Sequence, residues 1–289
     1  MRRLWMIVNR FDTNPIIHMG SGGDLGGNIN GPSLIRTPDW LKNPLGKYYL
    51  YFAHHIGSYI RLAYSNDLNG PWSIYDPGTL QLNNAYCYDH IASPDVHIND
   101  NRREIRMYYH GMIAKETQRT KVALSKDGIN FKAYPEILGT SYFRVFKWDG
   151  YYYAIGMPGN IYRSKDGLTN FEQGPSLFTE NMRHCALKLE DNILKVFYTN
   201  AFDAPEVIYL VSIDLSPNWH DWRESKSIII LEPKMKYEGA DMPVEPSKRG
   251  AIMEKARQLR DPSIFQEGDN TYLLYSVAGE QGIAIASLD

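Results

Sequence analysis

The chain has 289 residues, of which 43% are hydrophobic and 22% are charged, with a formal net charge of −2. This near balance of charge provides no electrostatic basis for binding nucleic acid or an anionic membrane, so neither is expected as a partner. Two cysteines, Cys87 and Cys185, are too few for a disulfide framework.

The N-terminal residues 1–11, MRRLWMIVNRF, combine a basic start with a short apolar run. Asn9 and Arg10 interrupt this run, which is too short for a secretory signal or a membrane span. We therefore expect a cytoplasmic protein from the sequence as it stands, or a secreted or periplasmic one if a signal has been removed.

From about residue 31 onwards the chain repeats one unit, which consists of an apolar strand, a polar turn and an aromatic strand. The five copies begin at Gly31, Ser93, Tyr142, His184 and Asp261. Most copies continue into a third segment that alternates like a half-buried strand, as in residues 59–67 (YIRLAYSND) and 121–128 (KVALSKDG). In the first four copies, a fourth strand is expected within residues 72–78, 131–136, 170–175 and 225–233.

The fifth copy ends with the chain after its third strand, and residues 4–10 (LWMIVNR) can supply the missing fourth one. Five four-stranded units closed by the opposite terminus predict an all-β, five-bladed β-propeller that forms a single domain over residues 1–289. Only residues 250–260 (GAIMEKARQLR) indicate any helix, and no more than a turn of it. The long connection over residues 237–262 is expected at the rim of the pocket.

In a propeller, the first strand of each blade lines the central channel, so the residues that start these strands converge on one pocket. Two positions after each start lie Ser33, Asp95, Arg144, Ala186 and Ser263. Beside the starts lie Asn30, Arg183 and Arg260, and the loop into the second copy carries Asp89 and His90. The predicted pocket therefore contains acids, histidines, arginines and a tyrosine from at least four blades.

Three segments resemble motifs of the five-bladed glycosidases, the superfamily of glycoside hydrolase family 43 and its relatives in families 32, 117 and 130. They are SPDVHIND at residues 93–100, SKDGINF at 125–131 and RDPSIF at 260–265. The resemblance covers nearly the whole chain and implies a carbohydrate ligand and glycoside hydrolysis. The family 43 base, its pKa-adjusting aspartate and its acid would fall at Gly31, Tyr142 and His184, so none of the three catalytic acids is present.

Cleavage of a glycosidic bond usually requires one protonated and one ionised carboxyl group. Asp95 and Asp261 are the predicted catalytic carboxylates, with His184 assisting proton transfer. Arg144 is predicted to orient the substrate, which would favour an acidic sugar. The alternative is that the two aspartates only neutralise the arginines of the channel.

Other residues are predicted to bind the sugar, and with Arg144 they are Asn30, Asp89, His90, Tyr142, Arg183, Glu245 and Arg260. Glu238 and Asp241 share the long connection with Glu245. Any of these three is an alternative acid or base, but solvated charges on a loop are the more common finding. For His54, His55 and His110, structural or substrate hydrogen bonds are favoured over metal binding because no paired ligand spacing is present. No cofactor is expected, with a channel-bound metal ion as the open alternative.

Two other functions compete with hydrolysis. The missing family 43 acids favour a non-catalytic carbohydrate-binding propeller, because a fold alone does not convey activity. The second is a polysaccharide lyase, in which Tyr142 or His184 would remove a proton from a uronate held by Arg144. The sequence leaves the sugar, the linkage, the stereochemical outcome and the oligomeric state open.

Overall fold

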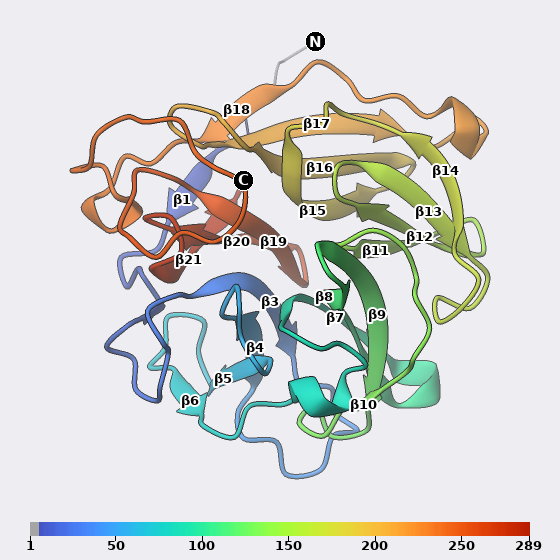
Figure 1. Cartoon of the computed structure of the whole chain (residues 1–289), viewed down its shortest axis with the longest axis horizontal. Helices are drawn as coiled ribbons and strands as arrows, with labels where there is room; N and C mark the ends of the chain where they lie inside the picture. The colour runs from blue at the N-terminus through green and yellow to red at the C-terminus, as the bar shows by residue number, and fades with distance from the viewer. Residues whose placement is uncertain (1–5) are drawn as a thin grey trace.

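The computed structural model describes residues 6–289, in which five antiparallel sheets surround a common axis (Figure 1). Blade one contains β3 (Asn30–Arg36), β4 (Tyr48–Ala53), β5 (Arg61–Ser65) and β6 (Ser73–Tyr75). Blade two contains β7 (Ile91–Asn99), β8 (Glu104–Ala114), β9 (Thr117–Ser125) and β10 (Lys132–Ala133). Blade three contains β11 (Arg144–Trp148), β12 (Tyr151–Gly156), β13 (Asn160–Ser164) and β14 (Glu172–Ser176).

Blade four contains β15 (Met182–Glu190), β16 (Ile193–Asn200), β17 (Ile208–Asp214) and β18 (Ile228–Leu231). Blade five contains β19 (Arg260–Glu267), β20 (Asn270–Val277) and β21 (Gly282–Leu288), and β1 (Val8–Arg10) completes it. The last blade is thus closed by the two ends of the chain, where Val8 pairs with Leu288 and Arg10 with Ala286. β2 (Ile17–His18) also pairs with β21.

These strands confirm the predicted all-β, five-bladed propeller and its closing N-terminal strand. Residues 4 and 5 of the predicted closing strand lie outside the described residues. The four predicted outer strands are present as β6, β10, β14 and β18. The expected turn of helix in residues 250–260 is wrong, because that segment is irregular, and the helical parts of the described chain are four short 3₁₀ turns. These turns are η1 (Leu82–Asn84), η2 (Asp100–Arg102), η3 (Trp219–Asp221) and η4 (Lys236–Glu238).

The blades are held together by apolar side chains packed between neighbouring sheets. Tyr49, Tyr51 and Met107 belong to one such layer between blades one and two, and Tyr153 and Trp222 pack between blades three and four. Aromatic and β-branched residues suit both faces of these buried strands, which explains the repeated aromatic second strands of the sequence. No helix of the described residues is long and apolar enough to cross a membrane.

The first strands share a local distortion where they meet the axis. Pairing between the first and second strands shifts register near the start of β3, β7, β15 and β19, which is the signature of a β-bulge. The backbone has positive φ at Gly31 (61°), Ser93 (49°), Tyr142 (61°) and Asp261 (46°). Positive φ costs about 1–3 kcal/mol in a non-glycine residue and is concentrated at functional sites.

Gly31 is required for close packing as well as for its φ, because a Cβ there would approach the Cα of Ser93 to 2.9 Å. The strands of two neighbouring blades therefore touch at this point of the channel. Bulges and left-handed residues thus occur together at the strand starts, the positions from which the sequence predicted the pocket.

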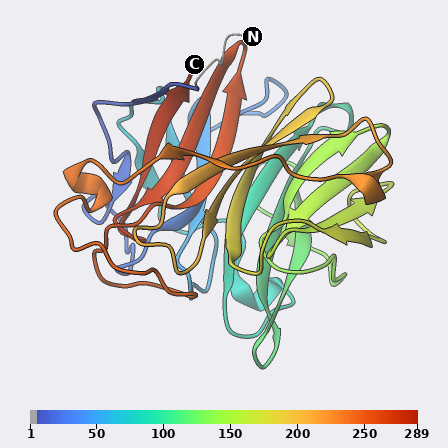
Figure 2. The same cartoon turned by 90° about the horizontal axis from the view of Figure 1, so that it is seen from above.

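The long connection between β18 and β19 is tied to the same end of the channel. Arg183 Nη1 donates to the Lys248 carbonyl oxygen at 2.8 Å, and Arg260 Nη1 donates to that of Gly250 at 3.1 Å. In Figure 2 the red-orange part of this connection lies at the lower edge of the molecule, as do cyan and green loops of blade two.

Candidate active site

A cluster of buried charged residues lies where the first strands start and the second strands end. We call it the axial cluster, and its members are His55, Arg183, His184, Glu206, Arg260, Asp261 and Glu280, none more than 8% exposed. Antiparallel pairing brings the end of each second strand beside the start of the first strand, so loops after β4, β16 and β20 supply His55, Glu206 and Glu280. Buried charges of this density must be paired.

Asp261 is almost fully enclosed, with 2% of its side chain exposed. Its Oδ1 lies 3.2 Å from His184 Nε2, and its Oδ2 accepts a hydrogen bond of 3.3 Å from Ser276. Burial raises the pKa of Asp261 to about 6, and the negative charge of Glu280 adds to this increase. Arg183, His55 and Arg260 oppose it. Asp261 is therefore partly protonated near neutral pH.

Glu280 is equally buried but has the opposite behaviour. Its Oε1 accepts from Arg260 Nη1 at 2.8 Å and lies 3.3 Å from His55 Nδ1, and its Oε2 accepts from Asn28 at 2.5 Å. Burial by itself would raise the pKa of Glu280, but His55, Arg260 and Asn28 lower it to about 2. Glu280 is therefore ionised throughout the range in which Asp261 titrates.

Asp261 and Glu280 are thus two buried carboxyl groups of one cluster whose pKa values are separated by their surroundings. Such a separation assigns one group as a proton donor and the other as a permanent anion. Structural ion-pair networks in protein interiors shift pKa values in the same way.

The two arginines of the cluster share one further acid. Glu206 Oε2 lies 3.4 Å from Arg183 Nη1 and 3.4 Å from Arg260 Nε. Glu206 Oε1 is buried and has no hydrogen-bond partner among the described residues. Arg183 and Arg260, which were predicted to bind substrate, therefore form ion pairs with buried acids and donate hydrogen bonds to backbone carbonyl oxygens.

Three aromatic rings fill the channel beside Asp261. The Tyr142 ring lies between His110 and His184, with centroid distances of 4.2 and 4.6 Å. Burial lowers the pKa of both histidines well below the ordinary value and raises that of Tyr142, so all three are neutral near pH 7. Because the Asp261 backbone N–H donates to His184 Nδ1 at 3.3 Å, the His184 proton lies on Nε2, facing the Asp261 carboxyl group.

A cavity of about 560 Å³ opens at this end of the channel, and we call it the mouth cavity. Its lining includes His55, Asp89, His90, Gln118 and Arg119. Cavities of this size accommodate small-molecule ligands. His55 is the member of the axial cluster that lines it, so His55 connects the cavity to Glu280.

Asp89 and His90, two predicted binding residues, form one wall of the mouth cavity. Asp89 Oδ2 lies 2.9 Å from His90 Nδ1, and His90 Nε2 is 3.1 Å from the Gln118 side-chain amide. Asn30 lies deeper, where it donates to Glu280 Oε2 at 3.2 Å. The structure thus brings Asp89 and His90 together at the cavity and places Asn30 behind the carboxyl pair.

Asp95 lies apart from Asp261, and the two carboxylates share no hydrogen-bond partner in the described chain. Asp95 Oδ2 lies 2.8 Å from His97 Nε2 and accepts from the Val145 backbone N–H at 2.8 Å. Burial would raise the pKa of Asp95, but His97, Arg144 and the Val145 N–H lower it below the ordinary value. These contacts suit an ionised group fixed in the channel wall, and a catalytic role for Asp95 stays a prediction.

Arg144 is bound by the backbone of the two blades next to its own. Its Nε donates to the Cys185 carbonyl oxygen at 3.0 Å, and its Nη1 donates to that of Pro94 at 3.2 Å. The side chain therefore joins the first strands of blades two, three and four. Its predicted role in orienting substrate also stays a prediction.

The acids of the long connection occupy separate places. Glu238 is buried under the outer strand of blade five, where it pairs with Arg10 at 2.7 Å and accepts from Tyr275. Asp241 pairs with Lys255 at the surface. Glu245 is exposed and, with Arg260, borders a cavity of about 360 Å³ beneath this connection. Glu245 is thus the one of the three acids that borders a cavity next to the axial cluster.

The sequence did not predict Glu280 or Glu206 as site residues, nor the contact between His55 and Glu280. The comparison of strand starts could not reveal them, because they lie in the loops after second strands. They could have been found from the pairing of antiparallel strands, because the end of each second strand lies beside the start of the first strand. Within residues 6–289, no three His, Cys, Asp or Glu side chains are grouped so that they could hold a metal ion.

Solved structures with the same architecture define the class of protein as a five-bladed β-propeller of the kind found in family 43 glycoside hydrolases. A β-xylosidase/α-arabinofuranosidase of that family from a compost metagenome matches with a TM-score of 0.66 and 14% identity, over 98% of this chain and 96% of that one. A putative glycoside hydrolase from Bacteroides ovatus matches with a TM-score of 0.69 and 14% identity, over 98% and 96%. At these identities the likeness concerns the fold.

A nearer relative is uncharacterized protein R118 of Acanthamoeba polyphaga mimivirus. It is 36% identical over 324 aligned positions, which cover 98% of this chain and 90% of the relative. The chain therefore belongs to the same protein family as R118. No established family model matches the sequence.

Proposed function

We propose that the protein is a glycoside hydrolase that binds a terminal or short-chain sugar in the mouth cavity. The observation that carries this proposal is the presence of two buried carboxyl groups in the axial cluster, with the pKa of Asp261 raised to about 6 and that of Glu280 lowered to about 2. Hydrolysis of glycosides by two carboxyl groups needs one of each kind. The shared fold with family 43 enzymes supports the substrate class.

In this proposal, His55 transfers protons at the cavity and Glu280 positions it. Glu280 holds His55 Nδ1, which directs the other ring nitrogen away from the carboxylate. An imidazole held in this way by a carboxylate is a common general acid or base. Asp261 is the protonated acid of the pair, and His184 fixes its orientation through Oδ1.

The nature of the sugar follows from the charges around the mouth cavity. Arg119 lines the cavity and could hold a substrate carboxylate, a role that Arg144 can fill only by giving up its carbonyl partners. Asp89 and Glu116 line the same cavity and favour a neutral sugar with hydroxyl donors. We propose an acidic sugar held by Arg119, with a neutral sugar as the competing choice.

A panel of aryl glycosides of neutral sugars and uronic acids tests the proposal, using wild type, Asp261→Asn and His55→Gln. Turnover of at least one glycoside is expected, with about 10²–10⁴-fold loss in His55→Gln. His54→Gln is the matched control, because His54 bonds to the Gly26 carbonyl outside the cluster and its replacement should leave turnover intact. Full turnover by folded Asp261→Asn and His55→Gln would contradict the assignment.

A non-catalytic carbohydrate-binding protein is the second candidate. The observation that favours it is the enclosure of the carboxyl pair, with 2% and 0% of the Asp261 and Glu280 side chains exposed. Buried acids in contact with arginines can serve only to balance charge. Sugar binding by calorimetry without turnover of any glycoside would establish this function. Ultraviolet absorption from an unsaturated uronate would instead identify a lyase.

A further inference from the structure

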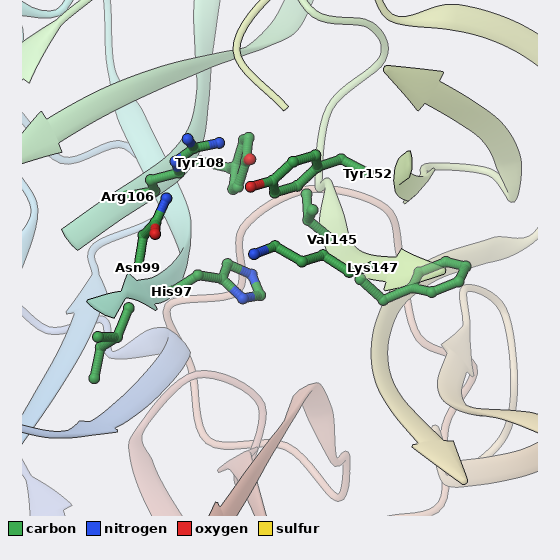
Figure 3. Close-up of a pocket in the computed structure, with 9 residues that line it drawn as sticks. His97, Asn99, Arg106, Tyr108, Val145, Lys147 and Tyr152 are labelled. Atoms are coloured by element: carbon green, nitrogen blue, oxygen red, sulfur yellow. The ribbon is translucent and has the colours of Figure 1, made fainter. Parts of the chain in front are cut away.

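A second cavity of about 290 Å³ lies at the other end of the first strands, between blades two and three (Figure 3). His97 and Asn99 come from the end of β7, Val145 and Lys147 from β11, and Tyr152 from β12. We call it the far cavity. The residues that line it are distinct from those of the mouth cavity, and no role for them follows from the proposed hydrolysis.

The far cavity carries an unbalanced positive charge. Arg106 at its edge is neutralised by Glu104 at 3.0 Å, and His97 Nε2 lies 2.8 Å from Asp95 Oδ2. Lys147 has no carboxylate within 4.0 Å in the described chain, and its ammonium group lies 4.9 Å from the centre of the Tyr152 ring. In Figure 3 the Lys147 side chain extends across the cavity towards the His97 ring.

The remaining surface of the cavity is suited to a flat or cyclic molecule. His97 uses its Nε2–H for the Asp95 carboxylate, so its Nδ1 is left to accept a hydrogen bond from a ligand hydroxyl. Val145 is buried and apolar, and Tyr108 and Tyr152 add aromatic surface. Rings of sugars and aromatic acids both bind against such surfaces.

We propose that the far cavity binds a small ring compound bearing one carboxylate, with the carboxylate on the Lys147 ammonium group and the ring against Val145. A carboxylate pairs with an ammonium group by charge-assisted hydrogen bonds. Two sources share this chemistry, a uronic acid and an aromatic carboxylic acid. The cavity volume admits one such ring.

Titration calorimetry with glucuronate and benzoate tests the proposal, with glucose and benzyl alcohol as neutral controls. At least one carboxylate should bind to wild type about tenfold more tightly than its neutral control. Lys147→Met, which keeps the apolar stem, should abolish that preference, and Lys147→Arg should keep it. Binding by glucuronate alone assigns the site to a uronate, and binding by benzoate alone to an aromatic acid.

Binding that is equal for carboxylates and neutral controls, unchanged in Lys147→Met, or absent for all four compounds would overturn the proposal. Turnover of aryl glycosides is expected to be the same in Lys147→Met as in wild type, because Lys147 lines only the far cavity. The outcome for this site is therefore independent of whether the hydrolase proposal holds.

Discussion

Asp95 and Asp261 lie close to the starts of first strands in two blades of one propeller, yet they differ in charge. Asp95 is ionised because a histidine, an arginine and a backbone N–H surround it. Asp261 has a raised pKa because burial and the neighbouring Glu280 outweigh two arginines and a histidine. The comparison teaches that the ionisation state of a carboxyl group depends on the charges and hydrogen-bond donors that other blades place around it. Its position in the repeat does not decide that state.

Loss of Glu280 should cause the largest change in stability. Glu280 pairs with buried cationic groups, and its charge contributes to the raised pKa of Asp261. Glu280→Gln leaves His55 without its anion and Arg260 with only the more distant Glu206, and removal of one partner from a buried ion pair costs about 3–5 kcal/mol. The pKa of Asp261 should fall, since the charge that raises it is gone. Urea unfolding measures the loss of stability. Stability equal to wild type would mean that Glu280 is not the anion of the cluster.

Replacement of Asp261 should change stability in the opposite direction. Its folded pKa of about 6 exceeds the ordinary value of 3.8, so wild-type stability falls as pH rises from about 4 to 6. Asp261→Asn keeps the hydrogen-bonding shape and removes this penalty, so it should gain up to about 3 kcal/mol at pH 8 and little at pH 4. Unfolding curves at the two pH values measure it. A loss of stability at pH 8 would contradict the raised pKa.

Replacement of Asp95 should lower the stability of the protein over the pH range in which Asp261→Asn raises it. The folded pKa of Asp95 lies below the ordinary value, so its contribution is present above about pH 4 and is lost as pH falls through the folded pKa. Asp95→Asn should lose about 1.5–3 kcal/mol at pH 7, the typical value for hydrogen bonds to charged groups. Thermal unfolding at pH 7 and pH 3 checks this. A cost that is larger at pH 3 would reverse the interpretation.

The smallest effect should be the coupling between the two aspartates. Their hydrogen-bond and ion-pair partners do not overlap, so the stability changes of Asp95→Asn and Asp261→Asn should add within about 0.5 kcal/mol. A double-mutant cycle at pH 7 measures the difference. A coupling well above this value would show that the two carboxylates act as one unit, as the sequence-based prediction of a paired site supposed.

The recurring strand units determined most of the fold by themselves. Apolar and aromatic residues on both sides of the strands require sheets that are buried on two faces. The fifth unit lacks its fourth strand, and the N-terminal segment can supply that strand and close the propeller. The β1–β21 pairing confirms this. The same reasoning located Asp261, His184 and Arg260 at the channel, because residues at the start of a first strand must approach the axis.

Only the tertiary structure decided which groups face one another. Glu280, Glu206 and His55 lie in loops whose sequence carries no periodic signal, and hydrogen bonds between blades one, four and five bring them to Asp261 and the arginines. The pKa values of Asp261 and Glu280 depend on burial and on charges distant in sequence, such as His55 and Glu280, 225 residues apart. The repeat could therefore predict where a site forms, while its ionisation states arise from contacts that exist only in the folded chain.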